Sequence, residues 1–197
     1  MIHVIGESHA EEYRNYPYFR VYIVPLATAH NLIEEKSTSE SSQKIKQILK
    51  GIPEKDYIMF VLGEIDCRVH IYQIYEKEGE TKPLETYIEN TVNRYITYIK
   101  TLNRNVILQT VPPAGYYDPN TYPFYGSAKD RAYINKTFNE LLSKRCESEN
   151  IPCVDIYDKV ALPNGMANPE YLKDHVHLNL KATNLIVKRL REMCCIE

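Results

Sequence analysis

Five short apolar segments recur along this chain, each of strand length and each nearly continuous in its hydrophobicity. They are residues 3–5, 20–24, 57–62, 105–110 and 152–156. A continuous apolar run is typical of a strand that is buried on both faces. Helical periodicity lies between them, at residues 42–49, 84–102, 128–148 and 178–193. This alternation predicts a three-layer α/β/α sandwich of flavodoxin-like type, with a parallel sheet of about five strands.

The bulk properties narrow the range of partners and compartments. At 197 residues, with 44% hydrophobic and 25% charged side chains, the chain fits a single domain over residues 1–197. It has no basic and apolar leader and no apolar run of about 18 residues, so we expect a cytoplasmic protein without a membrane partner. The net charge of −2, with scattered basic residues, argues against nucleic acid. The oligomeric state is unknown at this stage.

The cysteines bear on the redox compartment. There are five of them, including the adjacent pair Cys194 and Cys195. An odd number without spaced pairs forms neither a disulfide framework nor a C-x-x-C metal site. We therefore expect reduced thiols.

The first strand is predicted to end at Gly6-Glu7-Ser8-His9. In open α/β sheets the ligand site lies outside the carboxyl ends of the strands. A serine at a turn from strand to helix most often caps the helix, and this remains one interpretation of Ser8. The same helix amides and dipole would also stabilise an oxyanion formed beside a nucleophilic serine.

A nucleophilic serine needs a base, and residues 173–179 read KDHVHLN. Asp174 and His177 are three residues apart, so in a helical turn Asp174 can hold one ring nitrogen while the other accepts the Ser8 proton. Alternatively, Asp174 caps a helix that begins near Leu178 and His177 is a half-buried polar residue. A third interpretation is a metal site formed by His175, His177 and Asp174. No further ligand cluster is evident, so we assign neither a metal nor a cofactor.

The third strand is predicted to end in the segment LGEIDCR, residues 62–68. The strand ends in Gly63, and the charged residues Glu64, Asp66 and Arg68 follow it. Taken alone, the charges favour an ion pair that organises the loop.

Together and in this order, the three stretches resemble the SGNH or GDSL-like hydrolase family. Gly6-Glu7-Ser8 corresponds to its first block, residues 63–66 to its Gly-x-Asn-Asp block, and residues 174–177 to its Asp-x-x-His block. The resemblance implies that Ser8 is the nucleophile and an oxyanion donor through its amide. It also implies that His177 is the general base and that Asp174 orients it.

Two departures from the family pattern concern the oxyanion hole. The asparagine of the third block falls on Ile65, whose side chain has no hydrogen-bond donor, and Arg68 is our candidate replacement. This block is more similar to a sub-group in which it reads GEIDCR. The second block, residues 24–32, has no glycine, and the amide of Ala27 or Thr28 is expected to take its place.

A tyrosine-rich loop, residues 110–127, is predicted to follow the fourth strand at the same edge. Tyrosines such as Tyr116 suit the faces of sugars, although each of them could instead pack over the end of the sheet. His9 and His30 could face the cleft too, but such histidines more often serve packing, and we leave them outside the site. The first loop lacks the glycines of phosphate-binding loops, which argues against a nucleotide or flavin binder.

The resulting hypothesis is a serine-dependent esterase that acts on a small-molecule or glycan acyl ester, such as an O-acetylated carbohydrate, through an acyl-enzyme. The family resemblance implies acyl removal from glycans, lipids or small esters. Two alternatives remain open. One is a weak or inactive module that binds a glycan or acyl group, and the other is an acyltransferase that uses the same serine.

Overall fold

The structure is a computed structural model that describes residues 1–34, 40–118, 120–193 and 195, so Cys194 lies outside the described residues. Its centre is a parallel sheet with the strand order β2-β1-β3-β4-β5. The strands are β1 (Ile2–Gly6), β2 (Phe19–Ile23), β3 (Tyr57–Val61), β4 (Val106–Gln109) and β5 (Cys153–Val154). The predicted flavodoxin-like α/β/α class is confirmed, because this order is that of the flavodoxin type.

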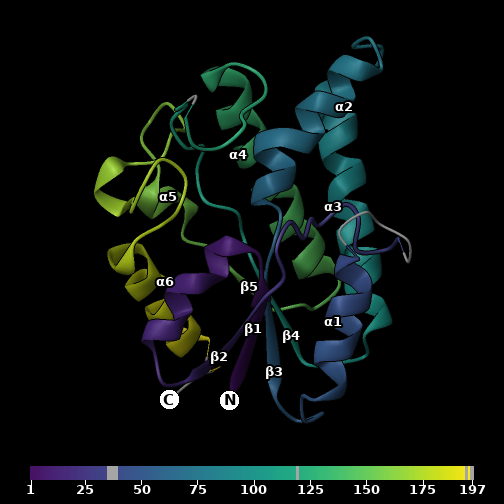
Figure 1. Cartoon of the computed structure of the whole chain (residues 1–197), viewed down its shortest axis with the longest axis vertical. Helices are drawn as coiled ribbons and strands as arrows, with labels where there is room; N and C mark the ends of the chain where they lie inside the picture. The colour runs from purple at the N-terminus through teal and green to yellow at the C-terminus, as the bar shows by residue number, and fades with distance from the viewer. Residues whose placement is uncertain (35–39, 119, 194, 196–197) are drawn as a thin grey trace.

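Helices cover both faces of the sheet (Figure 1). On one face the apolar core involves α1 (Ser41–Lys50), α2 (Ile71–Lys77), α3 (Leu84–Thr101) and α4 (Ala128–Ser148). On the other face it involves a 3₁₀ helix, η1 (Ser8–Asn15), together with α5 (Tyr157–Val160) and α6 (Leu180–Glu192). All five residues of β1 are buried between these layers, which explains the continuous apolar runs.

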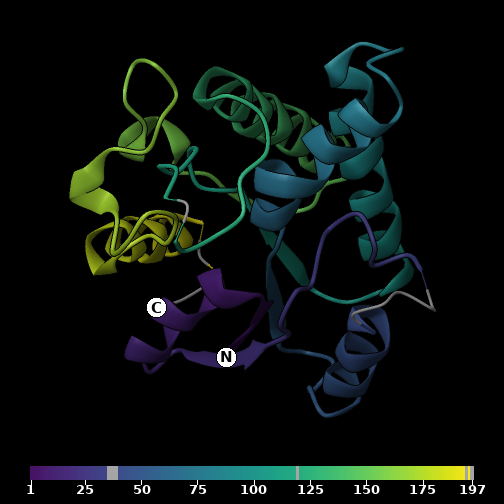
Figure 2. The ribbon, with the colours of Figure 1, turned by 45° about the horizontal axis from the view of Figure 1, so that its top comes forward.

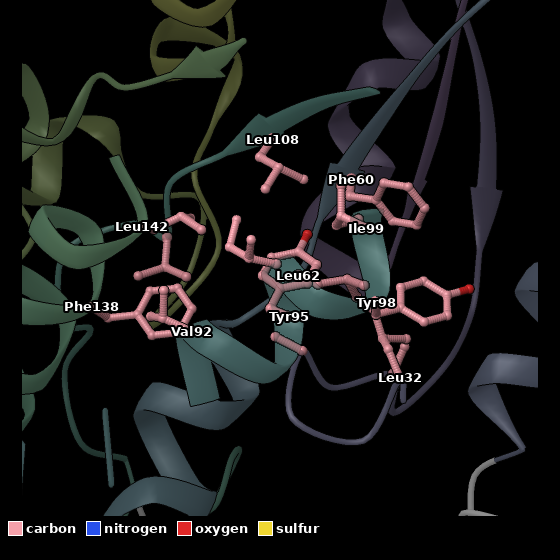
Figure 3. Close-up of a cluster of buried hydrophobic side chains, with 14 of the residues drawn as sticks. Leu32, Phe60, Leu62, Val92, Tyr95, Tyr98, Ile99, Leu108, Phe138 and Leu142 are labelled. Carbon is pink, nitrogen blue, oxygen red and sulfur yellow. The ribbon is translucent and has the colours of Figure 1, made fainter. Parts of the chain in front are cut away.

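The larger core lies between the sheet and α3 and α4 (Figure 3). Val92, Tyr95 and Ile99 of α3 recur at intervals of three or four residues, so they share the helix face that packs towards Phe60 and Leu108 of the sheet. This packing fixes the positions of the strands, whose carboxyl ends carry the candidate site.

One local prediction was wrong. The segment at residues 62–68, which we expected to be a loop, runs into a π-helical turn, η2 (Asp66–His70), which is followed by α2. The buried charges of Asp66 and Arg68 interrupt the apolar periodicity there. The alternative interpretations of Ser8 and Asp174 as helix caps do not hold, because Glu7 caps η1 and Asn179 caps α6.

Gly6 allows β1 to end in close contact with β3. A Cβ atom at this position would lie 2.5 Å from the Val61 carbonyl oxygen and 2.9 Å from the Ala10 Cβ. We expect Gly6→Ala to lower the free energy of unfolding by about 3 kcal/mol, because the Val61 backbone cannot move away from the added Cβ as a flexible side chain could. Denaturant unfolding measures this loss. The matched control is Gly51→Ala, where the nearest atom would be 3.6 Å away, and an equal loss there would contradict the argument.

The carboxyl ends of the strands gather the segments that carry the candidate site. Figure 2 shows the segment after β4 running alongside the yellow-green segment that precedes α6. The Tyr116 amide donates to the His175 carbonyl there, at 2.9 Å. Within the described part of the chain, no helix is long and apolar enough to cross a membrane.

Candidate active site

The structure brings Ser8, His177 and Asp174 together at this edge. The Oγ of Ser8 lies 2.8 Å from Nε2 of His177, and Nδ1 of His177 lies 2.8 Å from Oδ2 of Asp174. Ser8 is the first residue of η1 and is exposed, whereas the ring of His177 is mostly covered. The hydroxyl, imidazole and carboxylate thus form one hydrogen-bonded chain that starts at the surface.

The segment that carries His177 is a tight turn and not the helical turn we expected. Oδ1 of Asp174 accepts from the amides of Val176 and His177, both at 2.8 Å, and the Lys173 amide donates to the His177 carbonyl. Burial alone would raise the pKa of Asp174, but these amides and the His177 ring outweigh it and lower the pKa. Asp174 therefore carries a negative charge beside the imidazole.

Glu7 lies beneath the serine. Its buried carboxylate accepts from the Ser8 hydroxyl at 2.9 Å and from the His9 amide at 3.2 Å. Burial would raise the pKa of Glu7, but the charge and hydrogen bonds of His9 and the Ser8 hydroxyl lower it. The Ser8 hydroxyl thus has two acceptors, Glu7 and His177, for a single proton.

Asp66 points to the loop that follows β2. It is fully buried and accepts from the amides of Ala29, at 2.7 Å, and His30, at 3.2 Å. Burial raises the pKa of Asp66 to about 7, against the effect of these amides. Ala27 and Thr28 are buried in the same loop, and the Ala27 amide donates to Val24 at 3.2 Å. Asp66 thus holds the loop in which we expect an oxyanion donor.

Arg68 turns towards the tyrosine-rich loop. Its Nε donates to Glu64 at 2.6 Å and its Nη1 donates to the Pro123 carbonyl at 2.7 Å. Its guanidinium also lies over the rings of Tyr122 and Phe124, about 5.5 Å from each centroid. The contact between Arg68 and Glu64 is the ion pair that the charges alone favoured in the sequence. Through its other contacts, Arg68 anchors the tyrosine-rich loop. Gly63 precedes the pair with a φ of +115°, a conformation that favours glycine.

The tyrosine-rich loop, described apart from residue 119, meets the site through a tyrosine that our site prediction left out. The Tyr116 hydroxyl donates to the Ala167 carbonyl at 2.8 Å, so Tyr116 packs the loop. Tyr122 instead sets its ring edge-on against His177, with centroids 5.4 Å apart. His30, for its part, contacts Thr91 of α3 and does not join this group.

A cleft of about 210 Å³ opens beside the serine. Its walls comprise Ser8, His9, Glu11, Glu12, Tyr122, Lys173, Asp174, His177 and Leu178. A larger hollow of about 740 Å³ lies at the opposite end of the sheet, near Arg104, and contains none of the predicted site residues. Of these two hollows, the smaller one reaches the hydrogen-bonded chain.

The histidines of the H-x-H pattern have separate partners. His175 lies 3.2 Å from Asp118, whereas His177 faces Asp174 and Ser8. Among the described residues, no group of three or more His, Cys, Asp or Glu side chains is placed to hold a metal ion.

Comparison with known proteins connects this arrangement to one family. Residues 10–190 match the model of the GDSL-like Lipase/Acylhydrolase family. No curated protein matches the chain.

Solved structures with the same fold include a GDSL-like lipase from Bacteroides thetaiotaomicron, with 18% identity and a TM-score of 0.64. The match covers 98% of this chain and 86% of that one. An acetyl xylan esterase, AlAXEase, has 12% identity and a TM-score of 0.57, with 98% and 99% covered. An acetylxylan esterase from Geobacillus stearothermophilus has 14% identity and a TM-score of 0.54, with 98% and 93% covered.

Proposed function

Because the chain belongs to the GDSL-like lipase/acylhydrolase family and is a serine ester hydrolase, we propose that Ser8, His177 and Asp174 are its catalytic triad. The observation that carries this proposal is the continuous chain of two 2.8 Å contacts from Asp174 through His177 to Ser8. We propose further that residues 1–197 form one domain, because Ser8 near one end and His177 near the other contribute to this single chain.

In the proposed reaction, Ser8 Oγ attacks the ester carbonyl while His177 Nε2 takes its proton. Asp174 accepts from Nδ1 throughout and stabilises the imidazolium. The tetrahedral intermediate collapses when the alcohol leaves with the proton from His177. Water then adds to the acyl-serine, giving its proton to His177, and the carboxylic acid is released as Ser8 regains a proton.

The side chain of Ile65 has no hydrogen-bond donor for the oxyanion. Backbone amides therefore stabilise most of its negative charge. The Ser8 amide is the first donor, and the Thr28 amide is our candidate for the second, because the Ala27 amide already donates to the Val24 carbonyl. Arg68 reaches the oxyanion only if it releases the Pro123 carbonyl, which it binds at 2.7 Å. In this proposal the third block supports two loops: Asp66 holds the loop after β2, and Arg68 holds the tyrosine-rich loop. Membership of the GEIDCR-type sub-group remains a prediction.

The cleft favours a small acyl group on a polar alcohol. Glu12 and Lys173 form an ion pair of 2.6 Å on its wall, and burying these charges under a long acyl chain would cost their hydration. Tyr122 offers an aromatic face with a polar tip, which suits a sugar ring. The acetylxylan esterases with the same fold support an O-acetylated carbohydrate as the substrate.

The direct test is mass spectrometry of the protein after reaction with a fluorophosphonate, with peptide mapping. We expect one stoichiometric adduct, on Ser8, because a hydroxyl activated by His177 attacks the phosphorus centre. Ser8→Ala should carry no adduct. Ser127→Ala, which removes the helix-capping serine of α4, should be labelled like the parent. An unlabelled but folded parent protein would contradict the proposal and favour a glycan- or acyl-binding module.

A further inference from the structure

His9 connects the two segments that carry the proposed nucleophile and base. Its Nδ1 lies 2.9 and 3.1 Å from the two carboxylate oxygens of Glu7, the residue before Ser8. Its Nε2 lies 3.2 Å from the carbonyl oxygen of Val176, the residue before His177. A single imidazole thus spans segments that are 167 residues apart in the sequence.

Both ring nitrogens of His9 face groups that can only accept hydrogen bonds when Glu7 is ionised. A carboxylate has no proton to donate, and a backbone carbonyl never has one. A neutral imidazole has one N–H and would leave one of these contacts between two acceptors. The geometry therefore requires the doubly protonated ring, which donates to both partners.

We propose that His9, as an imidazolium, is a positioning residue that ties the nucleophile turn to the base loop and so keeps Ser8 within reach of His177. The inference rests on the proposed function, because it assumes that Ser8 and His177 react with substrate. His9 acts through its neighbours and does not contact the reacting atoms itself.

The charges around His9 agree with this state. Burial of the ring lowers its pKa, but Glu7 and, more weakly, Glu64 raise it, and the result is a pKa of about 9. Glu64 is itself paired with Arg68, and the ring of His177 lies against the ring of His9 with centroids 4.5 Å apart. His9 should thus remain charged at neutral pH.

The same contact affects the proton of Ser8. Glu7 and His177 compete for this proton, and only transfer to His177 prepares the serine for attack. Two N–H groups of His9, its amide and Nδ1, already donate to the Glu7 carboxylate and weaken it as an acceptor. Without the imidazolium, the Ser8 hydroxyl would keep its hydrogen bond to Glu7, and the nucleophile turn would separate from the base loop.

The test compares rates of fluorophosphonate labelling of Ser8, between pH 6 and 10, in the full-length parent and in His9→Phe. Phenylalanine keeps a ring against His177 but loses both hydrogen bonds, so we expect labelling about 100-fold slower at pH 7. For p-nitrophenyl acetate, kcat should fall by a larger factor than KM changes, although His9 also lines the cleft. The matched control is His70→Phe, which changes a histidine at the end of η2 and should label at the parental rate.

The pH dependence separates positioning from a general loss of structure. In the parent protein, the labelling rate should decline as His9 loses its proton near pH 9, and this decline should be absent from His9→Phe. His9→Gln, which retains one donor, should label at a rate between those of the parent and His9→Phe.

The outcomes distinguish this inference from the proposed function. A parent protein that is not labelled on Ser8 overturns both. A labelled parent together with His9→Phe at the parental rate overturns only the role of His9. Should His9→Phe fail to fold, ¹⁵N NMR of the parent imidazole decides: two protonated nitrogens at pH 7 support the inference, and one overturns it.

Discussion

Replacing His177 with alanine is expected to lower kcat/KM for an acetyl ester by about 10⁶-fold, the loss typical of removing the base of a serine triad. His177 Nε2 is the acceptor for the Ser8 proton at 2.8 Å, and Glu7, the other acceptor, is held by His9. Without the imidazole, neither the attack of the serine nor the protonation of the leaving alcohol has a partner. Steady-state hydrolysis of an acetylated sugar measures the effect, and circular dichroism checks the fold.

The matched control is His175→Ala, two residues away. The His175 side chain is 47% exposed and pairs with Asp118, so its loss should change kcat/KM by less than about threefold. Equal losses at His175 and His177, with a zinc-dependent parent activity, would contradict the triad and favour the metal site.

The fold could be predicted because burial on both faces leaves a direct signature in the sequence. The runs at β1 and β3 are apolar at nearly every position, as a sheet covered by two helical layers requires. The run at residues 152–156 is a weaker case, because β5 contains only Cys153–Val154. The Asp155 carboxylate accepts from the Thr110 hydroxyl and the Tyr157 amide, and these bonds turn the chain into α5.

Ser8 could be placed at the carboxyl edge of the sheet because it follows β1 directly, and the family resemblance paired it with Asp174 and His177. The contacts of Arg68 and His9 could not be predicted from the sequence. Arg68 binds the carbonyl of Pro123, 55 residues away, and His9 binds that of Val176. A backbone carbonyl is present at every residue, so no pattern of side chains marks which one a distant donor will reach.

Asp174→Asn is the second replacement for which we expect a large loss, about 10⁴-fold in kcat/KM. The asparagine oxygen can still accept from the amides of Val176 and His177, so the turn should keep its shape. Its NH₂ group would then face Nδ1 of His177 as a donor. Nδ1 must become the acceptor, and the ring proton moves to Nε2, which faces Ser8. The base would thus present a proton to the nucleophile in place of a lone pair.

The pH dependence of stability provides an independent check of this replacement. The pKa of Asp174 is lowered in the folded state, so its ionisation stabilises the fold above its ordinary value of 3.8 and ceases to do so as the pH falls through the lowered value. Below about pH 4 the free energy of unfolding should therefore fall more steeply in the parent than in Asp174→Asn, as urea unfolding would measure. Identical pH profiles would contradict the lowered pKa of Asp174 in the folded protein.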